Sequence, residues 1–123
     1  FVDPVNAYHA IVDNEGHLVA YCCFGPDARV PGGDYDNQAL DIGLGVHPGL
    51  VGQGLGGTFV HAVLRFARQE LAPTEFRVTV AEFNERALRV WKKARFRPVQ
   101  RFERAPDGVQ DGTPFVILTR NSI

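Results

Sequence analysis

A glycine-rich stretch between two apolar segments constrains this chain more than any other part of its sequence. An apolar segment that ends at Val46 runs into a loop rich in glycine, and an amphipathic helix is expected to begin at Thr58. Glycine has no Cβ, so a phosphate can approach its backbone closely. The first N–H groups of a helix have no partner within the helix and lie at the positive end of its dipole. The stretch therefore predicts an anion site, most naturally for a pyrophosphate.

The rest of the chain alternates periodic segments with segments rich in glycine, proline, asparagine and aspartate. Strands are expected at 7–12, 17–24, 39–46, 76–81, 99–103 and 115–119, and helices at 58–71 and 85–94. The first helix carries an apolar stripe at helical spacing, and Asn84 is a typical N-cap for the second. Gly43 and Gly45 inside the third strand suggest a bulge. The order β-β-β-α-β-α-β-β predicts a mixed α/β fold in one domain spanning residues 1–123.

The composition excludes several classes of partner. With 123 residues, a net charge of −1 and 45% hydrophobic residues, the chain has the balance of an ordinary globular protein. This balance gives no electrostatic reason to expect a nucleic acid or an anionic membrane as partner. Cys22 and Cys23 are neighbours, so on a strand they point to opposite faces and suggest neither a disulfide nor a zinc site. We expect them to be core residues of a reduced, cytoplasmic protein without a metal ion.

One alternative for the glycine-rich stretch is a dinucleotide site. Gly52, Gly54 and Gly57 fit the pattern G-x-G-x-x-G, which is weakly specific on its own. Five residues separate Val46 from Gly52, whereas a dinucleotide loop has its first glycine at the turn directly after the strand. The acidic residue that would contact a ribose has only the late candidate Glu82. An NAD(P)-binding oxidoreductase domain is therefore the weaker alternative.

The stretch resembles the cofactor loop of the GNAT superfamily of N-acetyltransferases. That loop reads roughly V-x-P-x-x-(R/Q)-G-x-G-(I/L)-G, and this chain has Val46-His47-Pro48 followed by Val51-Gly52-Gln53-Gly54-Leu55-Gly56. A second family motif reads roughly N-x-x-A-x-x-x-Y-x-K-x-G-F. This chain follows its spacing with Asn84, Ala87, Trp91, Lys93 and Phe96. Two motifs in the family order, separated by a helix and a strand, are more specific than either alone.

The resemblance implies a GNAT-like acyltransferase fold in which acetyl-CoA, the cosubstrate, binds between the splayed strands at 39–46 and 76–81. Its pantetheine would pair with the open edge of the first strand, and its pyrophosphate would lie on backbone N–H groups of the glycine loop. A backbone N–H near Val46 would polarise the thioester carbonyl. The resemblance assigns cofactor binding to Leu44, Gly45, Val46, Val51, Gly52, Gln53, Gly54, Leu55, Gly56, Gly57, Thr58, Asn84 and Trp91.

The chain also departs from the family pattern. Val51 stands where the family prefers arginine or glutamine, so a side-chain donor to phosphate is missing. Trp91 stands where many members have a tyrosine that protonates the leaving thiolate, and the role is vacant or belongs to Tyr8, Tyr21 or Tyr35. Members usually open with a strand and two helices, whereas only residues 1–6 precede the first hairpin here. We therefore expect an N-terminally truncated chain whose open strand edge favours a homodimer.

The reaction implied is direct attack of a primary amine on the acetyl thioester, which makes the chain an N-acetyltransferase. The amine must lose a proton, and Asp41 is the first candidate for the base, with Glu82 second. The sequence pattern of each also fits a solvated carboxylate at a strand end. The acceptor is a small-molecule or peptide amine that the sequence does not identify. The sequence is also compatible with a non-catalytic acyl-CoA-binding module and with a purely structural domain.

Overall fold

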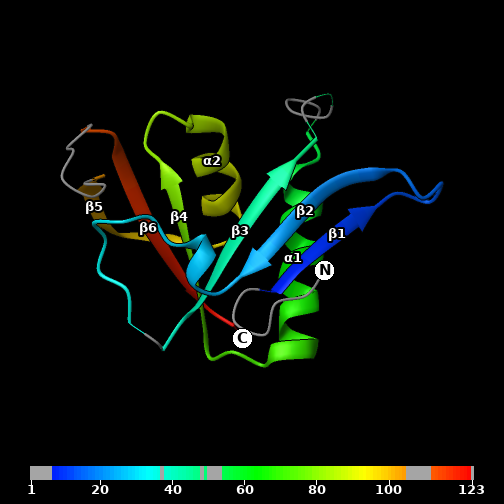
Figure 1. The fold of residues 1–123 in the computed structure, drawn as a ribbon, viewed down its shortest axis with the longest axis horizontal. Coiled ribbons are helices and arrows are strands. Elements are labelled where there is room, and N and C mark those ends of the chain that lie inside the picture. Colours follow the sequence, from blue (N-terminus) through cyan, green and yellow to red (C-terminus); the bar gives the residue numbers. More distant parts are fainter. Residues whose placement is uncertain (1–6, 37, 48, 50–53, 105–111, 123) are drawn as a thin grey trace.

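In the part of the chain that the structure describes, six strands form one mixed sheet (Figure 1). The computed structural model describes residues 7–36, 38–47, 49, 54–104 and 112–122. The strands are β1 (Ala7–Val12), β2 (Leu18–Phe24), β3 (Leu40–Val46), β4 (Glu75–Ala81), β5 (Arg97–Glu103) and β6 (Pro114–Asn121). The helices are α1 (Gly56–Leu71), α2 (Glu85–Lys93) and a short 3-10 helix, η1 (Pro26–Ala28). The strand order across the sheet is β1-β2-β3-β4-β6-β5.

The expected fold class and element order are confirmed. Half of the element ends coincide with the expected ones and the other half differ by one or two residues, as is usual for helix and strand boundaries. One of these differences affects the anion site, because α1 begins at Gly56 and not at Thr58. The last two glycines of the loop are thus the first residues of the helix, and their backbone N–H groups belong to its positive end.

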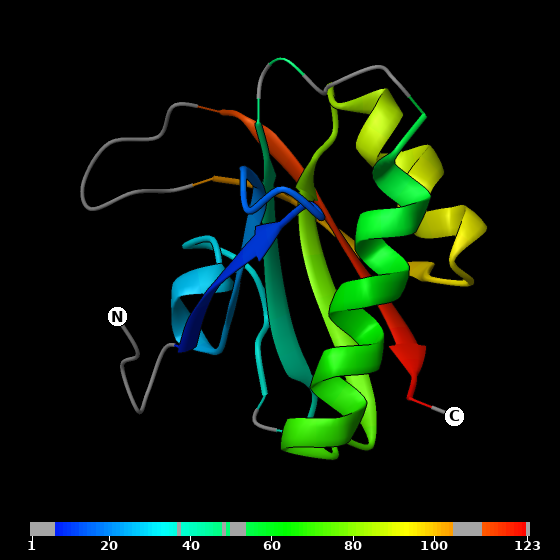
Figure 2. The same cartoon turned by 90° about the vertical axis from the view of Figure 1, so that its right-hand side faces the viewer.

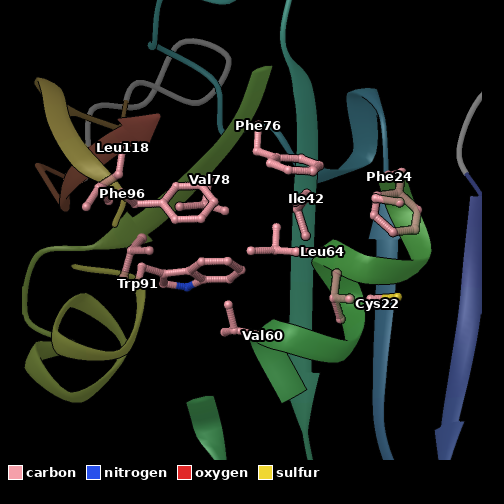
Figure 3. Packing of buried hydrophobic residues seen from close by; sticks show 13 residues of the cluster. Cys22, Phe24, Ile42, Val60, Leu64, Phe76, Val78, Trp91, Phe96 and Leu118 are labelled. Carbon is pink, nitrogen blue, oxygen red and sulfur yellow. The ribbon is translucent and has the colours of Figure 1, made fainter. Parts of the chain in front are cut away.

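Both long helices lie on one face of the sheet, and the core fills the space between them and the strands (Figure 2). The buried stripe of α1 consists of Phe59, Val60, Val63, Leu64 and Ala67. Its larger side chains meet Ile42, Phe76 and Val78 from the two central strands (Figure 3). Among the described residues, no helix is long and apolar enough to cross a membrane.

The segment between β2 and β3 lies on the other face of the sheet. Figure 2 shows η1 on the side of the strands away from α1. A Cβ built on Gly43 would lie 2.7 Å from the Cys23 sulfur and 3.5 Å from the Ala28 Cβ, so η1 covers the sheet at this point. Glycine is needed here because a Cβ would overlap the Cys23 sulfur of β2, whereas its distance to η1 is that of an ordinary contact.

The adjacent parallel strands β3 and β4 pair over only part of their length. The pairs are Leu40–Phe76, Asp41–Arg77 and Ile42–Val78, and no described residue beyond them continues the ladder. Figure 1 shows the two strands diverging toward their carboxyl ends. The splayed strands that the resemblance implied are therefore present, and the space between them is called the fork below.

The expected bulge in β3 is absent from the described pairing. Strands β2 and β3 keep one continuous register from the pair Ala20–Val46 to the pair Phe24–Ile42. The edge of β3 is open because β4 turns away from it, so no extra residue is needed in β3 itself. Gly43 and Gly45 have another reason to be glycine, which is the close approach of side chains from neighbouring elements.

The two cysteines are buried and unpaired on opposite faces. Cys22 belongs to the core beneath α1, whereas Cys23 lies against Gly43 on the other face. Burial raises the pKa of the Cys22 thiol to about 11, with a smaller contribution from the neighbouring Cys23. Their burial confirms the assignment as core residues. A buried thiol with a raised pKa is also a poor nucleophile at neutral pH.

The first turn of α1 packs directly against α2. A Cβ built on Gly56 would lie 2.9 Å from Cγ2 and 3.3 Å from Cγ1 of Val90, closer than side chains normally approach. Glycine at this position therefore sets the distance between the helices. This contact fixes where the amino end of α1 lies relative to α2.

We predict that Gly56→Ala destabilises the fold, because its methyl group would overlap Val90. Overpacking of this kind typically lowers the free energy of unfolding by about 1–3 kcal/mol. Chemical denaturation of the single variants and of Gly56→Ala with Val90→Ala measures the effect. In the Val90→Ala background the alanine should be tolerated, and an equal loss in both backgrounds would contradict the contact.

Candidate functional site

A cavity of about 590 Å³ opens at the fork, between β3, the beginning of α1 and one face of α2. This volume lies within the range of about 300–1,000 Å³ that is common for ligand pockets. Leu44 and Val46 supply the strand wall, and Val60 and Val90 supply apolar surface from the two helices. We call this cavity the fork pocket.

The amino end of α1 faces the fork pocket without a side-chain cap. Leu55 occupies the N-cap position, makes no capping hydrogen bond, and is followed by no acidic residue in the first turn. Gly54, with a φ of 76°, is in the left-handed region that favours glycine. Gly54 and Gly57 border the pocket, and a Cβ built on either would meet no atom of a described residue within 4 Å. Free N–H groups and open space thus coincide, as an anion site requires.

Asn84 caps α2 from the edge of the fork pocket. Its side-chain oxygen accepts a hydrogen bond from the backbone N–H of Ala87 at 3.2 Å, which confirms the expected N-cap. The cap uses the oxygen only, and the amide NH₂ group makes no hydrogen bond to another described residue. The NH₂ group can therefore donate into the pocket.

Trp91 forms an apolar wall of the fork pocket. It is 6% exposed, and its ring meets Phe96 edge to face with centroids 4.9 Å apart. Figure 3 shows its indole between Val60 on one side and Val78 with Phe96 on the other. An indole N–H is a hydrogen-bond donor but no useful acid, so Trp91 cannot replace an acidic hydroxyl.

Two cations line the fork pocket, and among the described residues no carboxylate does. Arg86 and Lys93 lie two helical turns apart on the pocket side of α2. Neither makes an ion pair or hydrogen bond with another residue in the described part of the chain. Helix α2 carries four basic residues, Arg86, Arg89, Lys92 and Lys93, and of these only Arg86 and Lys93 line the pocket. The pocket therefore combines a helix amino end with unpaired positive charge.

The pocket brings together most of the cofactor-binding residues expected from the sequence. Those that line it are Leu44, Val46, Gly54, Leu55, Gly56, Gly57, Asn84 and Trp91. Gly45 lies on β3 but faces the opposite side of the sheet, beneath Tyr21, and Thr58 is exposed without lining the pocket. Val51, Gly52 and Gln53 lie outside the described residues. The sequence did not single out the pocket-facing Val60 and Val90, although helical spacing from Gly56 points to Val60 and helical spacing from Ala87 points to Val90.

Asp41 does not lie at the fork pocket. It is 2% exposed at the closed end of the fork, where its carboxylate accepts hydrogen bonds from Arg77 at 2.6 and 2.8 Å and from Arg29 at 2.7 Å. The hydrogen bond to Asp41, opposed by burial, holds the pKa of Arg77 above its usual value. With both oxygens engaged by guanidinium groups, this carboxylate cannot reach an amine. The geometry thus argues against Asp41 as the base and gives it a structural role.

Glu82 also faces away from the fork pocket. It accepts hydrogen bonds from Arg101 of β5, with Nε at 2.5 Å and Nη2 at 3.3 Å, and borders a separate shallow hollow beside Lys92 and Gln100. A carboxylate held there by an arginine is poorly placed to take a proton at the fork. Neither expected base is therefore at the pocket, and the described residues that line the pocket include no carboxylate or imidazole.

We predict that Asp41→Asn destabilises the fold strongly, because Arg77 is itself 4% exposed. Removing one partner of a buried ion pair typically lowers the free energy of unfolding by about 3–5 kcal/mol. Chemical denaturation measures the loss. The matched control is Asp36→Asn, whose carboxylate also bonds Arg77 but is 62% exposed, so its effect should be much smaller. Similar losses for the two variants would contradict the role given to Asp41.

Comparison with known proteins identifies the fold. The model of the acetyltransferase (GNAT) family matches residues 2–96. A variant of spermidine N-acetyltransferase from Vibrio cholerae has a TM-score of 0.78 at 14% identity, over 98% of this chain and 68% of that chain. A dodecameric structure of that enzyme in an intermediate state gives 0.77 at 13% identity, over 98% and 67%.

A protein assigned as a phosphinothricin N-acetyltransferase gives a TM-score of 0.73 at 17% identity, over 98% of this chain and 71% of that one. Similarity at this level of identity establishes the shared fold. No curated protein matches the sequence. The family match covers most of the chain, and it includes the strand, glycine loop and helices that form the fork pocket. The chain belongs to the GNAT family of acetyltransferases, whose members use acetyl-CoA as cosubstrate.

Proposed function

We propose that this chain transfers the acetyl group of acetyl-CoA to a primary amine by direct attack of the amine on the thioester. Family membership supports acetyl transfer in general. The observation that supports this pocket as the site of the reaction is the beginning of α1, which is uncapped, lined by glycine and open to the fork. The identity of the amine and the details of the mechanism belong to the proposal.

Different parts of the fork pocket suit the successive chemical groups of acetyl-CoA. Backbone N–H groups around Gly56 and Gly57 suit the pyrophosphate, because a Cβ-free helix end lets phosphate oxygens approach. Val51, Gly52, Gln53 and the Thr58 hydroxyl stay candidates for the same group. The unpaired edge of β3 from Leu44 to Val46 offers strand-like hydrogen bonds to the pantetheine amides.

The proposed reaction depends more on the orientation of the thioester than on acid catalysis. Thiols have a pKa of about 8.5, so a thiolate is a tolerable leaving group without full protonation. A backbone N–H near Val46 would stabilise the oxyanion that forms at the thioester carbonyl. The apolar surface of Leu44, Val46 and Trp91 would keep water from the acyl group.

The acceptor that we propose is a primary amine of a small molecule or a peptide. The structurally similar proteins are named for spermidine and phosphinothricin, and both compounds carry a primary amine. A homodimer stays a prediction.

A non-catalytic acyl-CoA-binding module is the second candidate. It is favoured by the positions of Asp41 and Glu82, which are both bound to arginines and absent from the pocket lining. Both candidates predict acetyl-CoA binding, and only the first predicts turnover with an amine. An oxidoreductase domain would instead bind NADH.

We predict that Gly57→Val weakens acetyl-CoA binding without loss of stability. Its side chain would project into open space that the phosphates need, and valine is no worse than glycine within a helix. Losing one hydrogen bond to a charged group, about 1.5–3 kcal/mol, corresponds to roughly tenfold to a hundredfold in Kd. Gly54 is less suitable for this test, because its positive φ would strain any side chain.

Calorimetric titration with acetyl-CoA measures the effect, with NADH and NADPH titrated as controls. The matched variant is Ala62→Val, which adds a side chain at an exposed position of the same helix away from the pocket. If Gly57→Val left the Kd of acetyl-CoA unchanged, the assignment of the pyrophosphate to this helix end would be wrong. Binding of NADH in place of acetyl-CoA would support the dinucleotide alternative.

We also predict that Arg86 and Lys93 contribute to recognition of the 3′-phosphate of CoA. The wild-type chain should bind CoA more tightly than 3′-dephospho-CoA, by about tenfold if one charged hydrogen bond is lost. Arg86→Gln with Lys93→Gln should remove most of this preference. Arg89→Gln is the matched control, since Arg89 lies on the same helix but not in the pocket lining. An undiminished preference in the double variant would exclude both side chains from this contact.

A further inference from the structure

Tyr21 lies on the face of the sheet opposite α1 and α2. It is the direct partner of Gly45 across β2 and β3. The neighbouring pair, Cys22 and Leu44, packs with the helices. Successive residues of a strand alternate between faces, so Tyr21 and Gly45 share the face away from the helices.

The ring of Tyr21 reaches over β3. A Cβ built on Gly45 would lie 2.4 Å from Cε1, 2.5 Å from Cζ and 2.8 Å from the hydroxyl oxygen of Tyr21. The phenol can occupy this position only because residue 45 is glycine. Gly45 lies beyond the last β3–β4 pair, so the Tyr21 hydroxyl lies beside the part of β3 where the fork is open.

The Tyr21 hydroxyl is also available to a ligand. Tyr21 is 55% exposed, and its hydroxyl makes no hydrogen bond to another residue that the structure describes. Tyr35 on the same face differs, because its hydroxyl bonds Thr79 at 2.8 Å and accepts from the Val30 N–H at 3.0 Å. Of these two tyrosines, only Tyr21 has a hydroxyl free to bind.

The two faces of the fork differ in access. On the helix side, Val60 and Trp91 are 1% and 6% exposed and close the space behind Leu44 and Val46. On the other side, η1 covers β3 at Gly43, while the three atoms nearest to a Cβ on Gly45 all belong to the exposed Tyr21 ring. In the part of the chain that the structure describes, the side of Tyr21 is thus the open approach to an acyl group held in the fork.

We propose that Tyr21 is a positioning residue whose hydroxyl hydrogen-bonds to the acceptor amine at the open end of the fork. This inference rests on the proposed function. A phenol hydroxyl can accept a hydrogen bond, so it would hold one N–H of the neutral amine and direct the nitrogen lone pair toward the acyl carbon. A C–N bond forms and the C–S bond breaks with its electron pair on sulfur. The proton that nitrogen loses returns through solvent to the thiolate, which gives an amide and a free thiol.

The test compares wild type with Tyr21→Phe, using spermidine, phosphinothricin and a tripeptide with a free amino terminus as probes. Thiol release is followed at saturating acetyl-CoA, and acetyl-CoA binding is measured by calorimetry. For the amine that wild type acetylates, kcat/KM should fall about twofold to tenfold, as expected for a lost hydrogen bond between neutral groups. The Kd of acetyl-CoA should not change. An unchanged kcat/KM overturns the inference while leaving the proposed function intact.

Absence of any acetylation by wild type would instead contradict the proposed function, and this inference with it. A readout independent of turnover is chemical acetylation of Tyr21 by N-acetylimidazole, followed by peptide mass spectrometry. With CoA bound, the acceptor amine should protect Tyr21. Unaltered modification of Tyr21 in the presence of a bound amine would count against the contact.

Gly45→Ala provides a second test, because it displaces the Tyr21 ring without removing the hydroxyl. It should lower kcat/KM in the wild-type background and add little in the Tyr21→Phe background, since both changes act through one group. An equal loss in both backgrounds would assign the effect to β3 itself and contradict the inference. Leu18→Ala serves as the control, because Leu18 is on the same strand and is also 55% exposed.

Discussion

Asp41 and Arg77 form the middle one of the three pairs that join β3 to β4, and the fork depends on this contact. Two hydrogen bonds of 2.6 and 2.8 Å join their side chains on the face away from the helices. Parallel strands would ordinarily continue their ladder, but here they are held together only at one end. At the other end, Trp91 and its neighbours on α2 pack behind the opening. The charged contact thus fixes the point from which the strands diverge, and the site lies where they have separated.

The second constraint is the approach of α1 to α2 at Gly56 and Val90. A glycine there lets the amino end of α1 lie against α2, so that free N–H groups, the NH₂ of Asn84 and two cations border one cavity. Gly54 and Gly57 serve a different purpose, because nothing in the described structure occupies the space beside them. The same residue type therefore has two roles within four positions, which are helix packing at one and access for a ligand at the others.

Local patterns were sufficient to predict the elements and the glycine loop, because strand alternation, helical stripes and capping depend on nearby residues. The roles of Asp41 and Glu82 were not predictable in this way. Asp41 depends on Arg77, 36 residues away, and Glu82 on Arg101 in a strand that comes later in the chain. A signal did exist, since Arg77 interrupts a strand of buried residues and a buried charge requires a partner. The opening of the fork was also misassigned to a bulge, because the divergence of β4 is a property of two strands and not of either sequence alone.

The distribution of charge around the sheet has a consequence for anion binding. Asp36, Asp41 and Glu82 are each engaged by an arginine, and the two described cations without a partner in the fork pocket lie on α2. A free carboxylate near the amino end of α1 would repel phosphate and weaken the helix dipole that attracts it. Neutralising the carboxylates on the far face therefore does more than stabilise the fold. On the helix side, the charged side chains of described residues that line the fork pocket are all positive. On the opposite side, Asp36 and Asp41 are paired with arginines and Tyr21 is exposed, which would suit an anionic cosubstrate on one side and the proposed amine on the other.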